Sequence, residues 1–360
     1  MSAPPKLLTI GVTGLNAHDN PGPGVAVIRS LREFYRDGLR IVGLAYESLE
    51  PGIYMGDMVD VAYQVPYPST GSAALLERLA EINGQEQLDV IIPNFDSELF
   101  NFIKISAQMA KMGIKTCLPT HAQLAARDKI NLGDFGTRYH FKVPAFYMLN
   151  SVHDIDTAAE GLNYPLVIKG KFYEAQIVNN RETAQKAFYD LSAKWGLPVI
   201  AQQYISGTEI NVAGLGDGKG NAVSVVPMRK LYITDKGKAW AGITIEDNDL
   251  IALGRQFAAA SQWKGGFELE IMKDANGDLY VLEVNPRFPA WVYLTVAAGQ
   301  NQPAALVQLA LGNEVKPFKN YQAGKMFIRY SWDEVVDIGS FQQFSAFGRM
   351  ANTNNNKGQA

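Results

Sequence analysis

Apolar and polar positions divide the first 120 residues into short stretches that alternate between strand-like and helix-like patterns. Strand-like runs cover residues 7–12, 39–44, 89–93 and 114–118, and helix-like stretches cover residues 25–35, 73–82 and 97–112. Such alternation is typical of a parallel sheet covered by helices. We therefore predict an α/β unit over residues 1–120.

After Pro144 the pattern becomes richer in strands. Strands are expected at residues 145–149, 165–170, 175–178 and 198–205, helices at residues 182–195 and 249–263, and β-hairpins up to residue 283. We predict a second unit over residues 121–205 and a third over residues 206–345. The last residues, 346–360, end in a polar stretch with nothing to bury, so we expect a flexible tail there.

The charge balance and the single cysteine exclude several classes of protein. Lys and Arg total 33 against 36 Asp and Glu, so no global field attracts nucleic acid or an anionic membrane. Cys117 alone allows no intramolecular disulfide and no Cys-rich zinc site, and its apolar surroundings predict a buried strand residue. The chain start lacks a signal-peptide core, and no apolar run reaches the roughly 20 residues that span a bilayer. We expect a cytoplasmic protein.

Two strand-to-helix junctions carry polar residues at the ends of strands, where open sheets bind ligands. Residues 13–24 are rich in glycine, which would let backbone amides face an anion, but the spacing is not Gly-x-Gly-x-x-Gly. This loop could bind a nicotinamide nucleotide, contact another anion or substrate, or serve only as a connection. In the second junction, residues 92–98, Asp96 could contact a ligand or act as the N-cap of the next helix.

The stretch from Phe267 to Arg287 has the strongest hairpin pattern in the chain. Asn276-Gly277 between two alternating apolar runs predicts a two-residue type I′ turn. That turn would place Glu270 opposite Glu283 and Glu268 opposite Asn285. Four oxygen-bearing side chains, with Val281, would then share one face of the hairpin.

Like charges directly across a ladder are destabilising by roughly 0.2 to 1 kcal/mol, so a positive group is expected between them. Side chains that offer only oxygens suit a hard cation, and magnesium is usually held by one or two carboxylates and substrate phosphates. The alternative is a solvated acidic face. Pro286 then ends the ladder, and the Arg287 guanidinium would emerge beside this face, suited to a phosphate or carboxylate.

At these residues the chain resembles the ATP-grasp superfamily. It is similar to the ATP-binding halves of the carbamoyl phosphate synthase large subunit and related carboxylate-amine ligases, over roughly residues 7–315. The resemblance implies a Rossmann-like N-terminal domain followed by a two-lobed α+β ATP-grasp domain. It also implies that Glu270, Glu283 and Asn285 hold Mg²⁺ (or Mn²⁺), while Arg287 contacts a phosphate or the activated carboxylate.

Further ATP contacts follow from the same resemblance. Lysines would contact the phosphates, the backbone of a hinge would bind adenine and a glutamate would bind the ribose. In that order these residues are Lys129, Lys169 and Lys171; Gln202, Gln203, Tyr204 and Ile205; and Glu209. The glycine-rich lid common in relatives is missing after Lys169, so Lys171, Arg229 and Lys230 are expected to grip the γ-phosphate, unless the last two are surface residues of a strand.

The resemblance implies an enzyme in which ATP phosphorylates a carboxylate and a bound amine attacks the acyl phosphate. Expected substrates are small-molecule or peptide carboxylates and amines, with no nucleic-acid or membrane partner and a homodimer as one open arrangement. Three alternatives stay open: another acceptor chemistry, such as carboxylation or phosphorylation without ligation; a regulator that binds ATP without turnover; and an oxidoreductase that uses the first glycine-rich loop.

Overall fold

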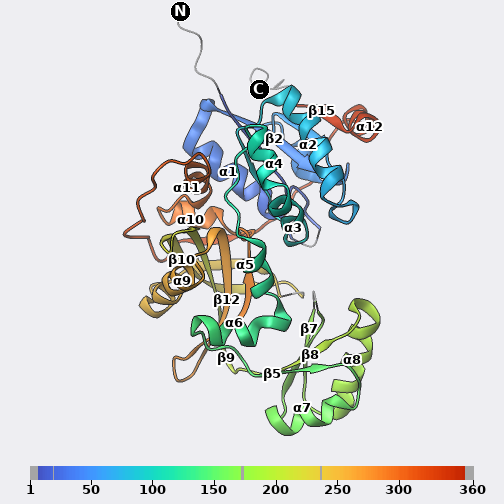
Figure 1. Cartoon of the computed structure of the whole chain (residues 1–360), viewed down its shortest axis with the longest axis vertical. Helices are drawn as coiled ribbons and strands as arrows, with labels where there is room; N and C mark the ends of the chain where they lie inside the picture. Colours follow the sequence, from blue (N-terminus) through green and yellow to red (C-terminus); the bar gives the residue numbers. More distant parts are fainter. Residues whose placement is uncertain (1–6, 19, 172–173, 236, 353–360) are drawn as a thin grey trace, which may run out of the picture.

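Three β-sheets follow one another along the long axis of the molecule (Figure 1). The computed structural model describes residues 7–18, 20–171, 174–235 and 237–352. A five-stranded sheet, which contains the first and last described strands, lies at one end, a six-stranded sheet lies in the middle and a four-stranded sheet lies at the opposite end. Helices accompany each sheet, which confirms the predicted α/β class.

The N-terminal sheet has the strand order β15-β3-β2-β1-β4, and β1 to β4 are parallel. Its strands are mostly runs of Val, Ile and Leu, as expected for parallel strands buried on both faces. They span Leu8–Val12 (β1), Leu39–Ala45 (β2), Val61–Gln64 (β3) and Val90–Ile92 (β4). The helices of this region are Pro23–Tyr35 (α1), Ser72–Glu86 (α2), Asp96–Lys104 (α3) and Ser106–Lys111 (α4), with 3₁₀ turns at Arg36–Gly38, Pro51–Tyr54 and Pro68–Thr70.

Two predicted elements of this region differ in the structure. The helix expected at residues 97–112 is broken at Ile105, whose side chain is buried in the core cluster with Phe102 and Met109. Residues 114–118 are not a strand, because they meet β4 at a single bridge, Val90 with Lys115. The chain then passes so close to Gly265 that a Cβ there would lie 2.6 Å from the Cys117 carbonyl oxygen. Cys117 is buried, but in this crossing and not in a strand.

The end of the described chain returns to the N-terminal sheet. Helix α12 (Ile338–Phe347) leads into β15 (Arg349–Ala351), which pairs antiparallel with β3. Phe344 and Met350 are 0% and 2% exposed and belong to the core cluster around Ile10. Apolar burial therefore orders residues 346–352 of the predicted flexible tail. It also joins residues 338–345, predicted to belong to the third unit, to the N-terminal sheet; residues 353–360 lie outside the described residues.

The middle sheet is antiparallel throughout, in the order β13-β12-β9-β10-β11-β14. One face packs on α9 through Leu253 and Phe257, in a cluster that includes Leu269, Ile271 and Val284. The opposite face carries the predicted carboxylates. The elements are Gly207–Asp217 (β9), Ala222–Ile233 (β10), Ala239–Thr244 (β11), Asn248–Ser261 (α9), Lys264–Asp274 (β12), Leu279–Asn285 (β13), Tyr293–Ala297 (α10), Gln302–Ala310 (α11) and Met326–Ile328 (β14).

The smallest sheet has the order β5-β8-β6-β7 and is also antiparallel. Two helices cover it and share its core cluster, which includes Leu166, Ile168 and Phe188. The elements are Phe146–Leu149 (β5), Asp154–Leu162 (α7), Leu166–Lys169 (β6), Ala175–Val178 (β7), Arg181–Trp195 (α8) and Val199–Gln203 (β8). The connection from the N-terminal sheet contains His121–Ala126 (α5), Lys129–Asn131 (η4) and Leu132–Tyr139 (α6). Over the described residues, no helix combines the length and apolarity that crossing a bilayer requires.

We predict that Phe344→Ala lowers the free energy of unfolding by about 3 to 5 kcal/mol, because it leaves a cavity in the N-terminal core. The matched control is Phe347→Ala in the same helix, since Phe347 is 78% exposed and its loss should cost less than about 0.5 kcal/mol. Urea unfolding followed by fluorescence measures both. Equal midpoints for the two variants would mean that α12 is not part of this core.

Candidate active site

The hairpin of β12 and β13 has the predicted facing pairs but not the predicted turn. Glu270 lies opposite Glu283, and Glu268 lies opposite Asn285. Gly277 has φ +88° and its N–H donates to the Asp274 carbonyl at 3.1 Å, whereas Asn276 has no positive φ. Type I′ needs positive φ at both turn residues, so the two-residue turn is wrong and a three-residue loop closes the hairpin.

A β-bulge restores the pairs that the longer loop would have shifted. The register changes by one residue between Glu270 and Ile271, and Ile271 pairs with Val281. The bulge also turns Val281, 1% exposed, into the core cluster with Val284. The prediction that Val281 shares the carboxylate face is therefore wrong, because the extra residue reverses the side on which it projects.

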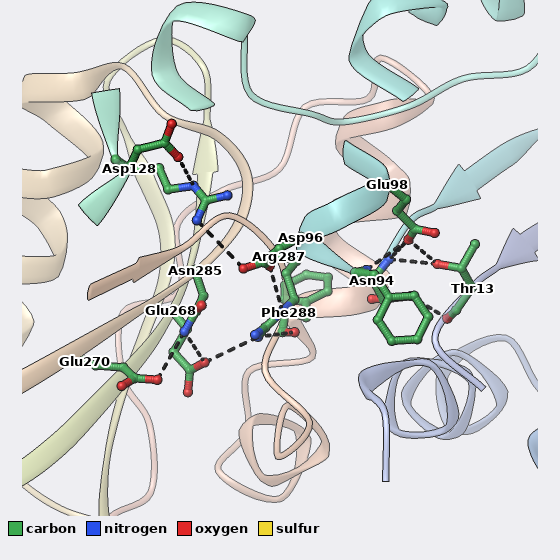
Figure 2. A network of polar contacts seen from close by, with 12 residues as sticks. Thr13, Asn94, Asp96, Glu98, Asp128, Glu268, Glu270, Asn285, Arg287 and Phe288 are labelled. Carbon is green, nitrogen blue, oxygen red and sulfur yellow. Dashed lines mark hydrogen bonds and ion pairs between the residues drawn. The ribbon is translucent and has the colours of Figure 1, made fainter. Parts of the chain in front are cut away.

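A run of polar contacts connects this hairpin with the N-terminal sheet (Figure 2). The Asn285 amide nitrogen donates to Glu268 Oε2 at 3.1 Å and to Glu270 Oε1 at 3.2 Å. Arg287 lies 3.4 Å from Glu268 Oε2 through NH1 and 3.1 Å from Asp96 Oδ1 through Nε. The carboxylate face of the middle sheet and the end of β4 thus belong to one site.

Asp96 is the first residue of α3, and Phe95 is the N-cap. The interpretation of Asp96 as the cap is therefore wrong. Its carboxylate contacts Arg287 and lies 3.8 Å from Arg127 NH1. Its position after β4 is that of a group at the carboxyl end of a parallel strand, where open sheets bind ligands.

Two lysines face the paired carboxylates. Lys129 Nζ in η4 lies 3.4 Å from Glu283 Oε2, and Lys169 ends β6 of the smallest sheet. Burial, and next the Lys129 ammonium, lower the pKa of Lys169 to about 8, against the opposing effect of Glu283 and Glu270. Burial raises the pKa of Glu283, and Lys129 opposes that shift. The site therefore brings together two ammonium groups and two carboxylates from four elements: η4, β6, β12 and β13.

The acidic side chains by themselves do not enclose a cation. Across the residues that the structure describes, no group of three or more His, Cys, Asp or Glu side chains could hold a metal ion. The predicted set consists of two carboxylates and the Asn285 amide, whose nitrogen is directed at Glu268 and Glu270 and whose oxygen stays an acceptor. Such a set fits Mg²⁺ when phosphate oxygens complete the coordination, as is usual for this ion.

Among the predicted nucleotide contacts, the hinge residues follow the end of β8. Gln202 is 4% exposed, and the Gln203 N–H donates to the Ala145 carbonyl at 2.8 Å. Tyr204 is exposed and Ile205 half-buried between β8 and β9. Burial raises the pKa of Asp128, which the Lys171 charge opposes, so Lys171 lies near the start of η4. Residues 171–175 stand where a glycine-rich lid is common in relatives. Of these, Phe172 and Tyr173 lie outside the described residues.

The two basic candidates on β10 lie on different sides of the sheet. Lys230 forms an ion pair with Glu209 of β9 and donates to the Gly237 carbonyl at 3.2 Å. Arg229 pairs with Ile210, whose side chain belongs to the core face, and it is exposed. Because neighbouring strand residues point to opposite faces, Arg229 is directed away from Glu209, so the structure brings only Lys230 into the site.

The glycine-rich loop at residues 13–24 is closed by its own backbone. The N–H groups of Gly22 and Gly24 donate to the carbonyls of Asn16 and Gly14, at 2.7 and 2.9 Å. A Cβ at Gly24 would lie 2.2 Å from the Thr13 carbonyl oxygen, so glycine is required here by close approach. These contacts support the interpretation of the loop as a connection more than as an anion site built from those two amides.

Arg329 is a basic residue of this region that sequence reasoning missed. It follows β14, and its NH1 donates to Asn20 Oδ1 in the glycine-rich loop. Burial lowers the pKa of Arg329 to about 10, and Glu268 opposes that shift. The sequence gives only a weak indication of this role. Phe327 and Arg329 are half-buried and alternate with the exposed residues Ile328 and Tyr330, but this alternation is recognisable only once the strand is known.

Comparisons with known proteins show which family and which fold this chain is similar to. The family described as ATP-grasp in the biosynthetic pathway with Ter operon matches residues 197–332. The D-alanine–D-alanine ligase of Ectopseudomonas mendocina is 27% identical over 177 residues, which cover 46% of this chain and 56% of the ligase. This chain therefore matches little more than half the length of that relative.

Solved structures extend the likeness to most of the chain. Biotin carboxylase from Campylobacter jejuni superposes with a TM-score of 0.68 at 17% identity, over 89% of this chain and 74% of the carboxylase. L-amino acid ligase from Bacillus licheniformis gives a TM-score of 0.62 at 18% identity, over 87% and 78% of the two chains. At these identities the likeness is one of fold.

Proposed function

Because the chain belongs to the ATP-grasp superfamily, we propose that it is an ATP- and magnesium-dependent carboxylate-amine ligase. ATP would phosphorylate a substrate carboxylate, ADP would be released, and an amine would then displace phosphate to give an amide. One observation carries this proposal: the Glu270 and Glu283 pair lies beside Lys129 and Lys169 on the open face of the middle sheet.

The charges of this arrangement suit phosphoryl transfer. Lys129 and Lys169 would contact the transferred phosphoryl oxygens, where negative charge is spread in the transition state. Glu270, Glu283 and Asn285 would hold Mg²⁺, which supplies further neutralisation of that charge when it is bound. Without anionic phosphates the two ammonium groups repel each other, which accords with the lowered pKa of Lys169.

The nucleoside would occupy the space between the smallest sheet and the middle sheet. The Gln203 carbonyl and the Ile205 backbone are our candidates for adenine. Glu209 is our candidate for the ribose hydroxyls, and its carboxylate pairs with Lys230 in the free protein. When the ribose hydroxyls bind Glu209, the Lys230 ammonium would become available to the phosphates. It would then supply positive charge in place of the backbone amides of a glycine-rich lid.

Arg329 and Arg287 are our candidates for the substrate carboxylates. Both guanidinium groups contact residues of the N-terminal region: Arg329 donates to Asn20, and Arg287 forms an ion pair with Asp96. The half-buried Arg329 guanidinium donates to a neutral amide and loses part of its hydration, so an anionic ligand at Arg329 would be favoured. Within the proposal, we assign residues 1–120 to a Rossmann-like N-terminal domain and residues 121–205 and 206–345 to two ATP-grasp lobes, except that residues 338–345 go with the N-terminal domain.

Carboxylation is the second candidate, because the fold resembles that of biotin carboxylase. We place amide formation first because one sequence relative is named D-alanine–D-alanine ligase and the fold also resembles that of L-amino acid ligase. The two reactions would share the nucleotide half of the site and differ in the carboxylate that ATP activates, which is bicarbonate in a carboxylation.

The direct test is incubation with ATP, Mg²⁺ and pooled carboxylates and amines, with hydroxylamine added to trap an acyl phosphate as a hydroxamate. We expect ADP, phosphate and amide or hydroxamate. Glu283→Gln should lower ADP release at least about 100-fold, because it removes a charged group of the transfer site. The control is Glu160→Gln, at an exposed position of α7. Formation of AMP and pyrophosphate would contradict the acyl phosphate.

Nucleotide binding should also take up protons at pH 8. With a pKa of about 8, the Lys169 amine is about half charged there, and a bound triphosphate raises that pKa because it favours the ammonium. We expect uptake of about half a proton at pH 8, measured by calorimetry of Mg·ATP binding in buffers of different ionisation enthalpy. Lys169→Met should abolish most of it; an unchanged uptake in that variant would assign the proton elsewhere.

Substitution of Arg329 tests the substrate half separately. Arg329→Leu should raise the KM for the carboxylate found in the pool about 10- to 150-fold, the equivalent of about 1.5 to 3 kcal/mol for a hydrogen bond to a charged group. Arg229→Ala is the matched control and should change KM less than about twofold, since Arg229 is exposed on the opposite side. The same KM in both variants would remove Arg329 from the carboxylate site.

A further inference from the structure

Glu268 is a buried carboxylate for which the proposed reaction gives no chemical step. It is 5% exposed and lies on the same face as Glu270. Isolating a carboxylate from water costs several kcal/mol unless hydrogen bonds replace those of water. The hydrogen-bond partners of Glu268 should therefore show what offsets the cost of burying its carboxylate.

The two oxygens of Glu268 accept from four side chains of two segments, β9 and residues 285–291. Oε1 accepts from Asn211 Nδ2 of β9 and from Trp291 Nε1, both at 2.8 Å. Oε2 accepts from Asn285 Nδ2 at 3.1 Å and from Arg287 NH1 at 3.4 Å. Only an acceptor with two oxygens can serve four donors in this way. Little capacity remains for Glu268 to be a metal ligand itself.

Glu268 decides which way the Asn285 amide faces. The amide nitrogen is held between Glu268 Oε2 and Glu270 Oε1, so the amide oxygen must face away from both (Figure 2). That oxygen is the atom a hard cation would take. With Glu270 alone as acceptor, one of the two amide hydrogens would lose its partner and the rotated amide would become accessible.

We propose that Glu268 is a positioning residue for the divalent cation that binds with the nucleotide: it aims the Asn285 carbonyl oxygen at the cation and holds the Arg287 guanidinium beside Asp96. This inference rests on the proposed function, because Asn285 must be a ligand for it to apply. Groups that orient metal ligands typically change metal affinity 10- to 100-fold when they are replaced.

The test measures Mn²⁺ binding to the protein with ADP by electron paramagnetic resonance, and ADP binding without metal by calorimetry. Glu268→Gln should weaken Mn²⁺ about 10- to 100-fold, because the remaining oxygen can accept from only one of the two donor pairs and the negative charge that holds Asn285 and Arg287 is lost. ADP affinity without metal should change less than about twofold. Trp291→Phe is the matched control: it removes a donor to Oε1 only, so Mn²⁺ affinity should change less than about threefold.

A reciprocal exchange keeps the test decisive if Glu268→Gln folds poorly. In the double variant Glu268→Gln with Asn285→Asp, the Gln amide donates to the new carboxylate and the total charge is unchanged. We expect the double variant to bind Mn²⁺ within about tenfold of the parent affinity. Asn285→Asp alone should bind Mn²⁺ more weakly than that, because the new carboxylate would lie against the carboxylates of Glu268 and Glu270.

The outcomes separate the two proposals. Parent-like Mn²⁺ affinity in Glu268→Gln, or an equal loss of ADP binding without metal, would overturn the positioning role and leave the proposed function standing. Failure of the double variant to recover would overturn it as well. If the parent protein binds no Mn²⁺ with ADP, the metal set of the proposed function is wrong and the positioning role falls with it.

Discussion

Two carboxylates that face each other across a β-ladder are the constraint on which the rest of this site depends. Glu270 and Glu283 repel each other, and the positive groups that offset this repulsion come from other parts of the fold. Lys129 approaches from the connection after α5, and Lys169 approaches from the end of β6 in a different sheet. The charge balance of the site thus depends on how the sheets are arranged.

The same face continues into the N-terminal sheet without a break in polar contacts. From Glu270 the contacts run through Asn285, Glu268 and Arg287 to Asp96 (Figure 2). A displacement of the N-terminal sheet would therefore alter the contacts at the hairpin, because each polar contact in this run needs its donor and its acceptor in fixed positions. The nucleotide half and the substrate half of the proposed reaction share these side chains, so they are physically coupled.

The hairpin shows how a correct conclusion can rest on a wrong local prediction. The two-residue turn at Asn276-Gly277 predicted the facing pairs, yet the loop has one residue more and a bulge after Glu270 removes the resulting shift. Turn type depends on local backbone preferences, but the register near the carboxylates depends on burying Ile271 and Val284 on the opposite face. Burial of that face outweighs the turn.

The sequence by itself determined the features that depend on short-range order: the alternation of strands and helices and the polar face of the hairpin that carries Glu268 and Glu270. The motifs of that hairpin also indicated the superfamily, and the single cysteine excluded a disulfide framework. Only the tertiary structure decided contacts between distant residues: Phe344 in the N-terminal core, Lys230 with Glu209, Asp96 with Arg287, and Arg329 with Asn20. Periodicity predicts which residues share a face of one element. Which face meets which neighbour depends on packing across the whole chain, and no local pattern contains that information.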